Sequence, residues 1–164
     1  MLKKRFSLIL TILFLITGLS LCYASNLEKK LFPPKLGTFK LVKLIKGKKA
    51  MEEVYKLHGK KINIKAAWVA HYENIKNPKD KVTVWISQAS SEKEAKKQVE
   101  VMMKKIINSS STPFYHFNKM KDVYIFFGLG KRHLVFPKKE FVFWITGEPG
   151  ELRYFVHYYY KVLK

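Results

Sequence analysis

The sequence predicts an α+β fold, a two-layer sandwich in which an antiparallel sheet carries helices on one face. Alternating apolar and polar residues indicate several strands, and apolar stripes with helical spacing follow them. The order strand–strand–helix occurs twice, and identical residues such as Trp85 and Trp144, or Glu92 and Glu151, stand 59 positions apart. A tandem β-β-α repeat, preceded by a β-α element, therefore predicts a sheet with pseudo-twofold symmetry.

The N-terminus has the order of a secretory signal peptide. Residues 3–5 are basic, residues 6–21 form an apolar run, and Ala24 ends a cleavage-site pattern of small residues. This pattern predicts a signal peptide over residues 1–24 that is cleaved, and hence an exported protein, periplasmic or at the cell surface. The run is shorter than the roughly 20 residues that cross a bilayer, so we expect no transmembrane helix in the mature chain.

Cys22 is the single cysteine of the chain and leaves two interpretations open. It could carry a lipid anchor, although the bulky Leu21 in front of it is unfavourable for that processing. Otherwise it leaves with the signal peptide, and the mature chain has neither a thiolate nor a disulfide. We favour the second interpretation.

One α+β domain is expected over residues 37–164, after an extended tether over residues 25–36 that contains two adjacent prolines. The domain begins with a strand at residues 38–45. A helix follows over residues 48–58, and Gly59 is a typical helix stop.

The first copy of the repeat covers about residues 60–107. It has two alternating strands, and Ser91 with Glu94 three positions later predicts a capping box at the start of its helix. The strands are expected at residues 61–72 and 81–87, with a turn at 76–81 between them.

The second copy covers about residues 119–164, and a further strand at residues 114–118 is expected to precede it. Gly128 and Gly130 interrupt its first strand and indicate a bulge or a bend. The remaining elements are a strand at residues 122–129 that continues at 133–136, a turn at Pro137, a strand at 141–146 and a helix from Leu152 onward.

The chain is strongly basic, with 32 lysines and arginines against 12 acidic residues and a net charge of +20. Such a charge favours anionic partners, for example phospholipid head groups, cell-wall polymers, nucleic acid or an acidic protein. We favour compositional bias, solubility or thermal adaptation as the cause of the excess, with selected anion binding as the alternative. Arginine is the better residue for recognising phosphate or carboxylate, and the chain has only Arg5, Arg132 and Arg153.

The segment Gly128–His133 resembles a phosphate-binding loop in composition, but strand patterns flank it on both sides. We expect a bulge or a bent hairpin there. The alternative is an exposed basic tip of Lys131, Arg132 and His133 that contacts an anion.

The last helix combines an inward apolar stripe with a second aromatic and basic side. This side consists of Tyr154, His157, Tyr158 and Lys161. It could be the rim of a wide core face, or a contact surface for a second copy of the chain, an envelope protein or a membrane interface. The stripe itself consists of Phe155, Val156, Tyr159 and Leu163.

Catalytic and metal-binding patterns are not evident in the sequence. The five histidines show no spacing of four residues, no HExxH motif occurs, and no GxSxG motif surrounds a serine. The sequence therefore predicts no catalytic residue, no metal ligand and no cofactor.

Three hypotheses for the function follow. The favoured one is an exported, non-enzymatic binding protein of the cell envelope with an anionic or protein partner. The second is a nucleic-acid-binding protein whose basic sheet stacks bases on Trp85 and Trp144, although we favour packing under a helix as the explanation of these residues. The third is an envelope hydrolase with an unrecognised site.

Overall fold

The structure, a computed structural model, describes residues 26–148 and 152–164. The chain divides into two compact units, Met1–Pro33 and Pro34–Lys164. The predicted signal peptide, and with it the question of a lipid anchor, lies outside the described residues.

In the first unit, residues 26–31 form a helix. The extended tether predicted over residues 25–36 is therefore wrong for this part. The reason is local, because leucine, glutamate and lysine in this stretch all favour the helix.

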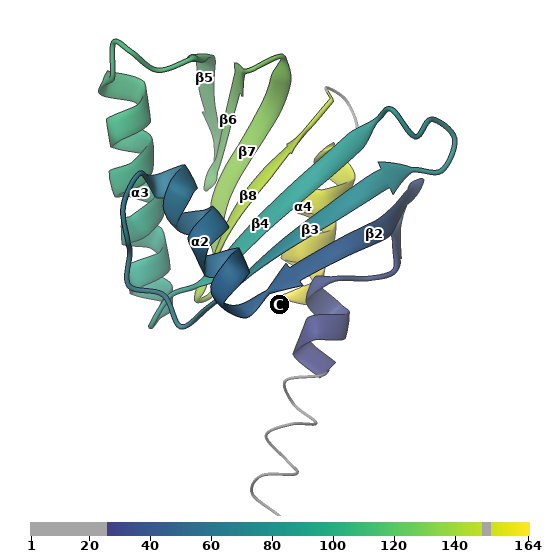
Figure 1. The fold of residues 1–164 in the computed structure, drawn as a ribbon. Helices are drawn as coiled ribbons and strands as arrows, with labels where there is room; N and C mark the ends of the chain where they lie inside the picture. Colours follow the sequence, from purple (N-terminus) through teal and green to yellow (C-terminus); the bar gives the residue numbers. More distant parts are fainter. Residues whose placement is uncertain (1–25, 149–151) are drawn as a thin grey trace, which may run out of the picture. The chain divides into compact units, whose positions relative to one another are not determined.

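One antiparallel sheet of eight strands forms the centre of the second unit (Figure 1). The strand order is β1-β2-β3-β4-β8-β7-β6-β5, so that two groups of four strands meet where β4 pairs with β8. This arrangement confirms the predicted α+β class and the antiparallel sheet. The strands are β1 (Lys35–Leu36), β2 (Phe39–Lys46), β3 (Ala66–Asn74), β4 (Lys81–Gln88), β5 (Phe114–Met120), β6 (Val123–Gly128), β7 (Lys131–Lys138) and β8 (Phe141–Gly147).

The centre of the sheet contains the predicted pseudo-twofold symmetry. Trp85 of β4 lies directly opposite Trp144 of β8. Because these residues occupy the same place in the two copies, a twofold axis normal to the sheet passes between them. The related strand pairs are β3–β4 and β7–β8. The second copy thus begins with β7, and not with the strand predicted at residues 122–129, which belongs to an added hairpin.

The two prolines of the repeat do not share a structural position. Pro78 lies in the turn between β3 and β4, but Pro137 lies in β7, opposite Val142. The turn predicted at Pro137 is therefore wrong, and the chain turns at Lys139, which has a φ of 50°. Proline is tolerated in β7 because the pairing of β7 with β6 ends at Val135.

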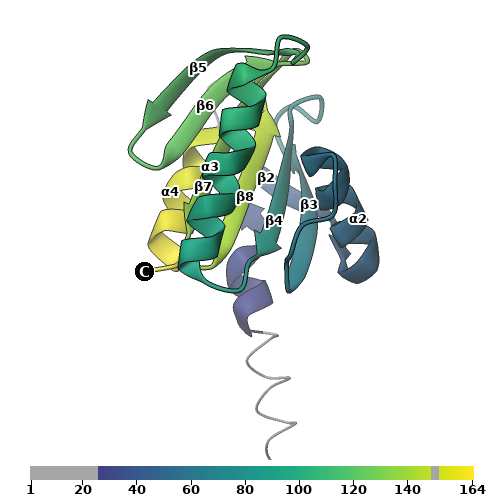
Figure 2. The ribbon, with the colours of Figure 1, turned by 90° about the vertical axis from the view of Figure 1, so that its left-hand side faces the viewer.

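Helices cover both faces of the sheet. α2 (Gly47–His58) and α3 (Glu92–Asn108) lie on one face, and α4 (Leu152–Val162) lies on the other (Figures 1 and 2). Adjacent residues of β8 prove this, because they point to opposite faces. Trp144 packs in the cluster formed with α3, whereas the ring of Phe143 lies 4.5 Å from that of Tyr159 in α4. The prediction of helices on one face only is wrong.

The physical reason is that the symmetric place for α4 is already occupied. α3 packs on β7 and β8, so the twofold axis would place α4 over β3 and β4 on the same face. There α2 packs mainly on β3, with Val54 and Val69 in one buried cluster. α4 instead packs on the opposite face, where the ring of Phe155 lies 5.5 Å from Phe39 and 5.2 Å from Tyr72.

The local signals for helix ends are confirmed. Ser91 Oγ accepts a hydrogen bond of 3.2 Å from the backbone N–H of Glu94 and begins α3. Gly59, with a φ of 65°, ends α2 in the left-handed conformation. The predicted apolar stripe of α3 is buried at Ala95, Val99, Met102 and Met103.

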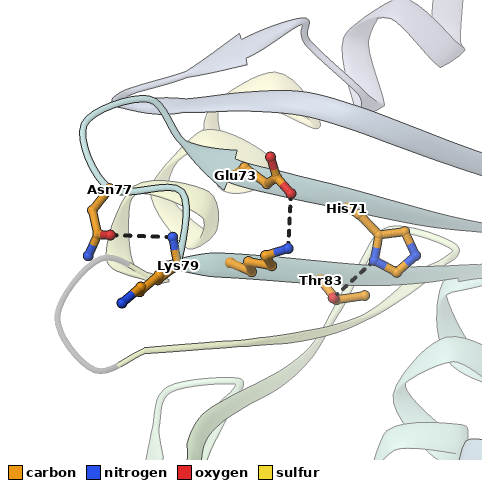
Figure 3. A network of polar contacts seen from close by, with 6 residues as sticks. His71, Glu73, Asn77, Lys79 and Thr83 are labelled. Atoms are coloured by element: carbon orange, nitrogen blue, oxygen red, sulfur yellow. Dashed lines mark hydrogen bonds and ion pairs between the residues drawn. The ribbon is translucent and has the colours of Figure 1, made fainter.

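The turn between β3 and β4 also forms where the sequence predicts it (Figure 3). Asn77 Oδ1 accepts a hydrogen bond of 3.3 Å from the backbone N–H of Lys79. Below the turn, Lys81 forms an ion pair of 3.1 Å with Glu73 across the two strands. These contacts are short-range in the chain, which explains why the sequence alone located the turn.

Candidate anion-binding groove

The segment Gly128–His133 is a tight hairpin between β6 and β7. Gly128 pairs with Lys131, so Leu129 and Gly130 form a two-residue turn with φ values of 54° and 73°. Positive φ at both turn residues suits the twist of the adjoining strands. The bent hairpin is thus confirmed, and the segment is not a phosphate-binding loop.

The three basic residues after this turn do not form a common tip. Lys131 is exposed, and Arg132 is half-buried on the face that carries α4. His133 is only 5% exposed and lies on the opposite face, among residues that pack with α3. The alternation of a strand separates them, so the predicted exposed tip is wrong.

His133 uses both ring nitrogens inside the protein. The indole N–H of Trp144 donates to Nδ1 over 3.1 Å, so this nitrogen is unprotonated, and Nε2–H donates to the carbonyl of Gly128 over 3.0 Å. Burial lowers the pKa of His133, the hydrogen bond to Gly128 acts against this, and the charge of Lys131 lowers the pKa further. His133 is therefore a neutral structural residue and not an anion ligand.

The face that bears Trp85 and Trp144 is covered. Trp144 is buried in a cluster with α3, and Trp85 packs against this cluster and against that of α2. The packing interpretation of the two tryptophans is thereby confirmed. The nucleic-acid hypothesis loses the open aromatic surface on which it relied.

A groove of about 660 Å³ lies on the other face, between α4 and the strands β6 and β7. Its apolar wall comes from both sides. Ile125 and Leu134 contribute from the sheet, and Leu152 and Val156 contribute from the helix. The groove is therefore the place where the added hairpin and the displaced helix meet.

The groove follows β7 from Arg132 to the level of Phe136. At the first end Arg132 pairs with Gly147, and a Cβ on Gly147 would lie 3.0 Å from Leu152 Cδ2, so α4 starts beside Arg132. At the other end the ring of Tyr160 lies 5.4 Å from that of Phe136. Four residues of a strand span roughly 13 Å, which gives the length of the groove.

Four basic side chains line the groove, namely Arg132 on β7, Arg153 and His157 on α4, and Lys121 in the turn between β5 and β6. Among residues 26–148 and 152–164, no carboxylate belongs to its lining. Within residues 26–148 and 152–164, neither arginine forms an ion pair. Two of the three arginines of the whole sequence thus meet at one site without a partner charge from the described residues.

Two polar atoms at the groove are buried without a hydrogen-bond partner among the described residues, Arg132 Nε and Tyr160 Oη. Leaving a buried donor unsatisfied costs roughly 1–3 kcal/mol. The guanidinium of Arg132 lies over the ring of Phe127 at 5.0 Å, which fixes its orientation. Burial, and then the charge of Asp122, raise the pKa of Tyr160, so that its hydroxyl keeps the proton. Both groups can donate to a ligand.

The predicted site residues are only partly brought together. The groove unites Arg132 with His157, whereas Lys131, Tyr154, Tyr158 and Lys161 lie outside its lining. Tyr154 is 47% exposed, and the guanidinium of Arg153 lies 5.2 Å from the centre of its ring.

Sequence reasoning missed Arg153 and Tyr160 as site residues. The scarcity of arginine in a lysine-rich chain was the signal that could have identified Arg153. No such signal existed for Tyr160, because its hydroxyl is one of nine in the chain.

No group of three metal-ligating side chains occurs among the described residues, and no described helix is long and apolar enough to cross a membrane. The chain matches no family model, no curated protein and no solved structure.

Proposed function

We propose that this chain is an exported, non-enzymatic binding protein of the cell envelope, and that it binds an anionic ligand in the groove of Arg132 and Arg153. The observation that carries the proposal is the buried Nε–H of Arg132, which has no acceptor among the described residues. An anion at this place would supply the acceptor.

The surroundings of Arg132 support an anion in particular. A guanidinium is a planar donor group that matches carboxylate and phosphate, and its hydrogen bonds to a charged acceptor contribute about 1.5–3 kcal/mol. Arg153 adds positive charge at the same groove, and no carboxylate among the described lining residues competes with the ligand. The net charge of +20 attracts anions toward the molecule as a whole.

The lining of the groove favours binding over hydrolysis. In the part of the chain that the structure describes, it contains neither serine, cysteine nor carboxylate, so these residues offer no usual nucleophile and no acid–base pair. Export is proposed from the basic, apolar and small-residue order of residues 1–24. Self-association through the tyrosines of α4 stays a prediction.

The test is a phosphate titration followed by NMR of the arginine Nε–H groups. A mature chain, from residue 25 onward, contains only two arginines, so two resolved signals are expected and assignment is simple. We expect phosphate to shift the Arg132 signal with saturation in the millimolar range. Arg132→Gln should abolish the phosphate response of the neighbouring backbone amides.

Lys131→Gln is the matched control, because it removes the same charge from the same hairpin at an exposed position. This variant should bind phosphate like the wild type. Equal loss of binding in Arg132→Gln and Lys131→Gln would show a diffuse charge effect and contradict the proposal. Absence of any shift at Arg132 would contradict it as well.

A further inference from the structure

We infer that the ligand of the groove is a free single-chain amphiphile, with a carboxylate or phosphate head at Arg132 and an unbranched apolar chain along β7. The inference rests on the proposed function, because it takes the bound anion as the head of this molecule. It goes further in assigning the remainder of the groove to an aliphatic chain.

The size of the groove carries the first step. A water molecule takes about 30 Å³ in the liquid, so the cavity of about 660 Å³ corresponds to roughly twenty waters. A carboxylate or phosphate group replaces only a few of them. The volume falls in the range of about 300–1,000 Å³ that is usual for sites of small organic ligands. An anion alone would leave most of this groove unfilled.

The distribution of polar and apolar groups carries the second step. The charges of Arg132 and Arg153 stand at the end of the groove where α4 begins. Past them the sheet side of the wall is aliphatic, with Leu134 only 5% exposed and Ile125 paired directly opposite it on β6. Val156 faces these residues from α4. His157 adds one polar side chain from α4. A charged end followed by an aliphatic channel is complementary to an amphiphile.

The length of the groove limits the chain. The span from Arg132 to the level of Phe136 is roughly 13 Å at about 3.3 Å per residue. An extended chain advances about 1.2 Å per bond, because three backbone bonds span about 3.3–3.6 Å, so roughly eleven bonds fill the groove. At this far end the lining includes the polar side chains of Tyr160, beside Phe136, and Lys121, in the turn just before β6. Chains of more than about twelve carbons should therefore gain nothing further.

The test measures binding by calorimetry for hexanoate, octanoate, decanoate, dodecanoate and tetradecanoate, each below its micelle concentration. Each buried methylene contributes about 0.8 kcal/mol, which is about a fourfold change in Kd. From hexanoate to decanoate we expect roughly a 200-fold gain, and then a plateau beyond dodecanoate. Decyl phosphate should bind with a Kd similar to that of decanoate, because both head groups are anions that accept hydrogen bonds from Arg132.

Variants separate the head from the chain. Arg132→Gln should weaken decanoate by roughly 10–150-fold, and Lys131→Gln by less than about twofold. Val156→Thr keeps the shape of the side chain but adds a hydroxyl to the wall. It should weaken decanoate several-fold and leave the phosphate response of Arg132 unchanged. Arg132→Lys keeps the positive charge but lacks the planar guanidinium. It replaces Arg132→Gln in this test if Arg132→Gln does not fold.

The outcomes distinguish the inference from the proposed function. If phosphate shifts the Arg132 signal but chain length has no effect on Kd, the amphiphile is wrong and the anion site stands. If neither phosphate nor any alkanoate binds, the proposed function and the inference are both wrong. Binding to vesicles of anionic phospholipid without binding of free alkanoates would overturn the inference in favour of a membrane surface.

Discussion

Replacing Tyr160 by phenylalanine should stabilise the ligand-free protein, although it removes a polar group from a half-buried residue. The hydroxyl of Tyr160 is buried and has no hydrogen-bond partner among the described residues. Phenylalanine keeps the ring contact with Phe136 at 5.4 Å and the contact of Lys138 Nζ with the ring at 5.1 Å. The substitution therefore removes a desolvation cost and keeps both of these contacts of the ring.

An unsatisfied buried group costs roughly 1–3 kcal/mol, and we expect about 1–2 kcal/mol to be regained. At about 2.1 cal/mol/K per residue, the unit Pro34–Lys164 has an unfolding entropy of roughly 0.27 kcal/mol/K. Each kcal/mol then raises Tm by roughly 4 °C, so the expected increase is about 4–7 °C. Circular dichroism during heating, together with urea unfolding in buffer without phosphate or carboxylate, measures it.

Tyr154→Phe is the matched control on the same helix, because that residue is 47% exposed and water can satisfy its hydroxyl. It should change Tm by less than about 2 °C. A Tyr160→Phe variant as stable as the wild type, or less stable, would refute the reasoning. It would show that the Tyr160 hydroxyl already has a hydrogen-bond partner in the solvent or the protein, and that it is not an unsatisfied donor at the far end of the groove.

Two further predictions concern the frame around the groove. The pKa of His133 is lowered in the folded state, so the unfolded chain takes up a proton first as the pH falls below about 6.5, and stability declines from there. Urea unfolding at pH 7.5 and 5.5 measures this loss of stability. The free energy of unfolding should fall less between the two pH values for His133→Gln than for the wild type, and an equal fall would contradict a neutral, buried imidazole at His133. Gly128→Ala should destabilise by about 2 kcal/mol or more, because the added Cβ would lie 2.3 Å from Phe114 Cδ1. A Cβ at Gly130 would meet open space, so Gly130→Ala strains only the backbone, whose φ is 73°, and should lower the free energy of unfolding by about 1 kcal/mol. A larger loss of stability in Gly130→Ala than in Gly128→Ala would contradict this geometry.

Short-range signals in the sequence predicted most of the elements. Ser91 and Glu94 are three residues apart, and Asn77 bonds to the backbone two residues later, so each contact is present in the local chain. The alternating strands and the duplicated Trp85 and Trp144 also predicted the symmetric centre of the sheet. Pro137 shows the limit, since an identity within the repeat did not guarantee an equivalent position.

The groove could be predicted only in fragments. Arg132 and His157 were both candidates, but no pattern in the sequence linked a residue next to a hairpin with one on the last helix. His133 was a false candidate because the strand places it on the opposite face from Arg132, where Trp144 and Gly128 use both of its nitrogens. Neighbouring residues with the same chemistry thus received opposite environments.

The sequence by itself determined the basic charge, most of the strands and helices, the helix caps and the twofold centre of the sheet. These properties depend on composition and on interactions within a few residues. Only the tertiary structure decided which face of the sheet α4 covers. α2 already occupies the symmetric place, and a local sequence pattern cannot show that two helices compete for one surface. That displacement brings Arg153 and Tyr160 of the last helix onto the two ends of the strand segment that begins at Arg132, more than twenty positions earlier in the chain, and so it creates the groove.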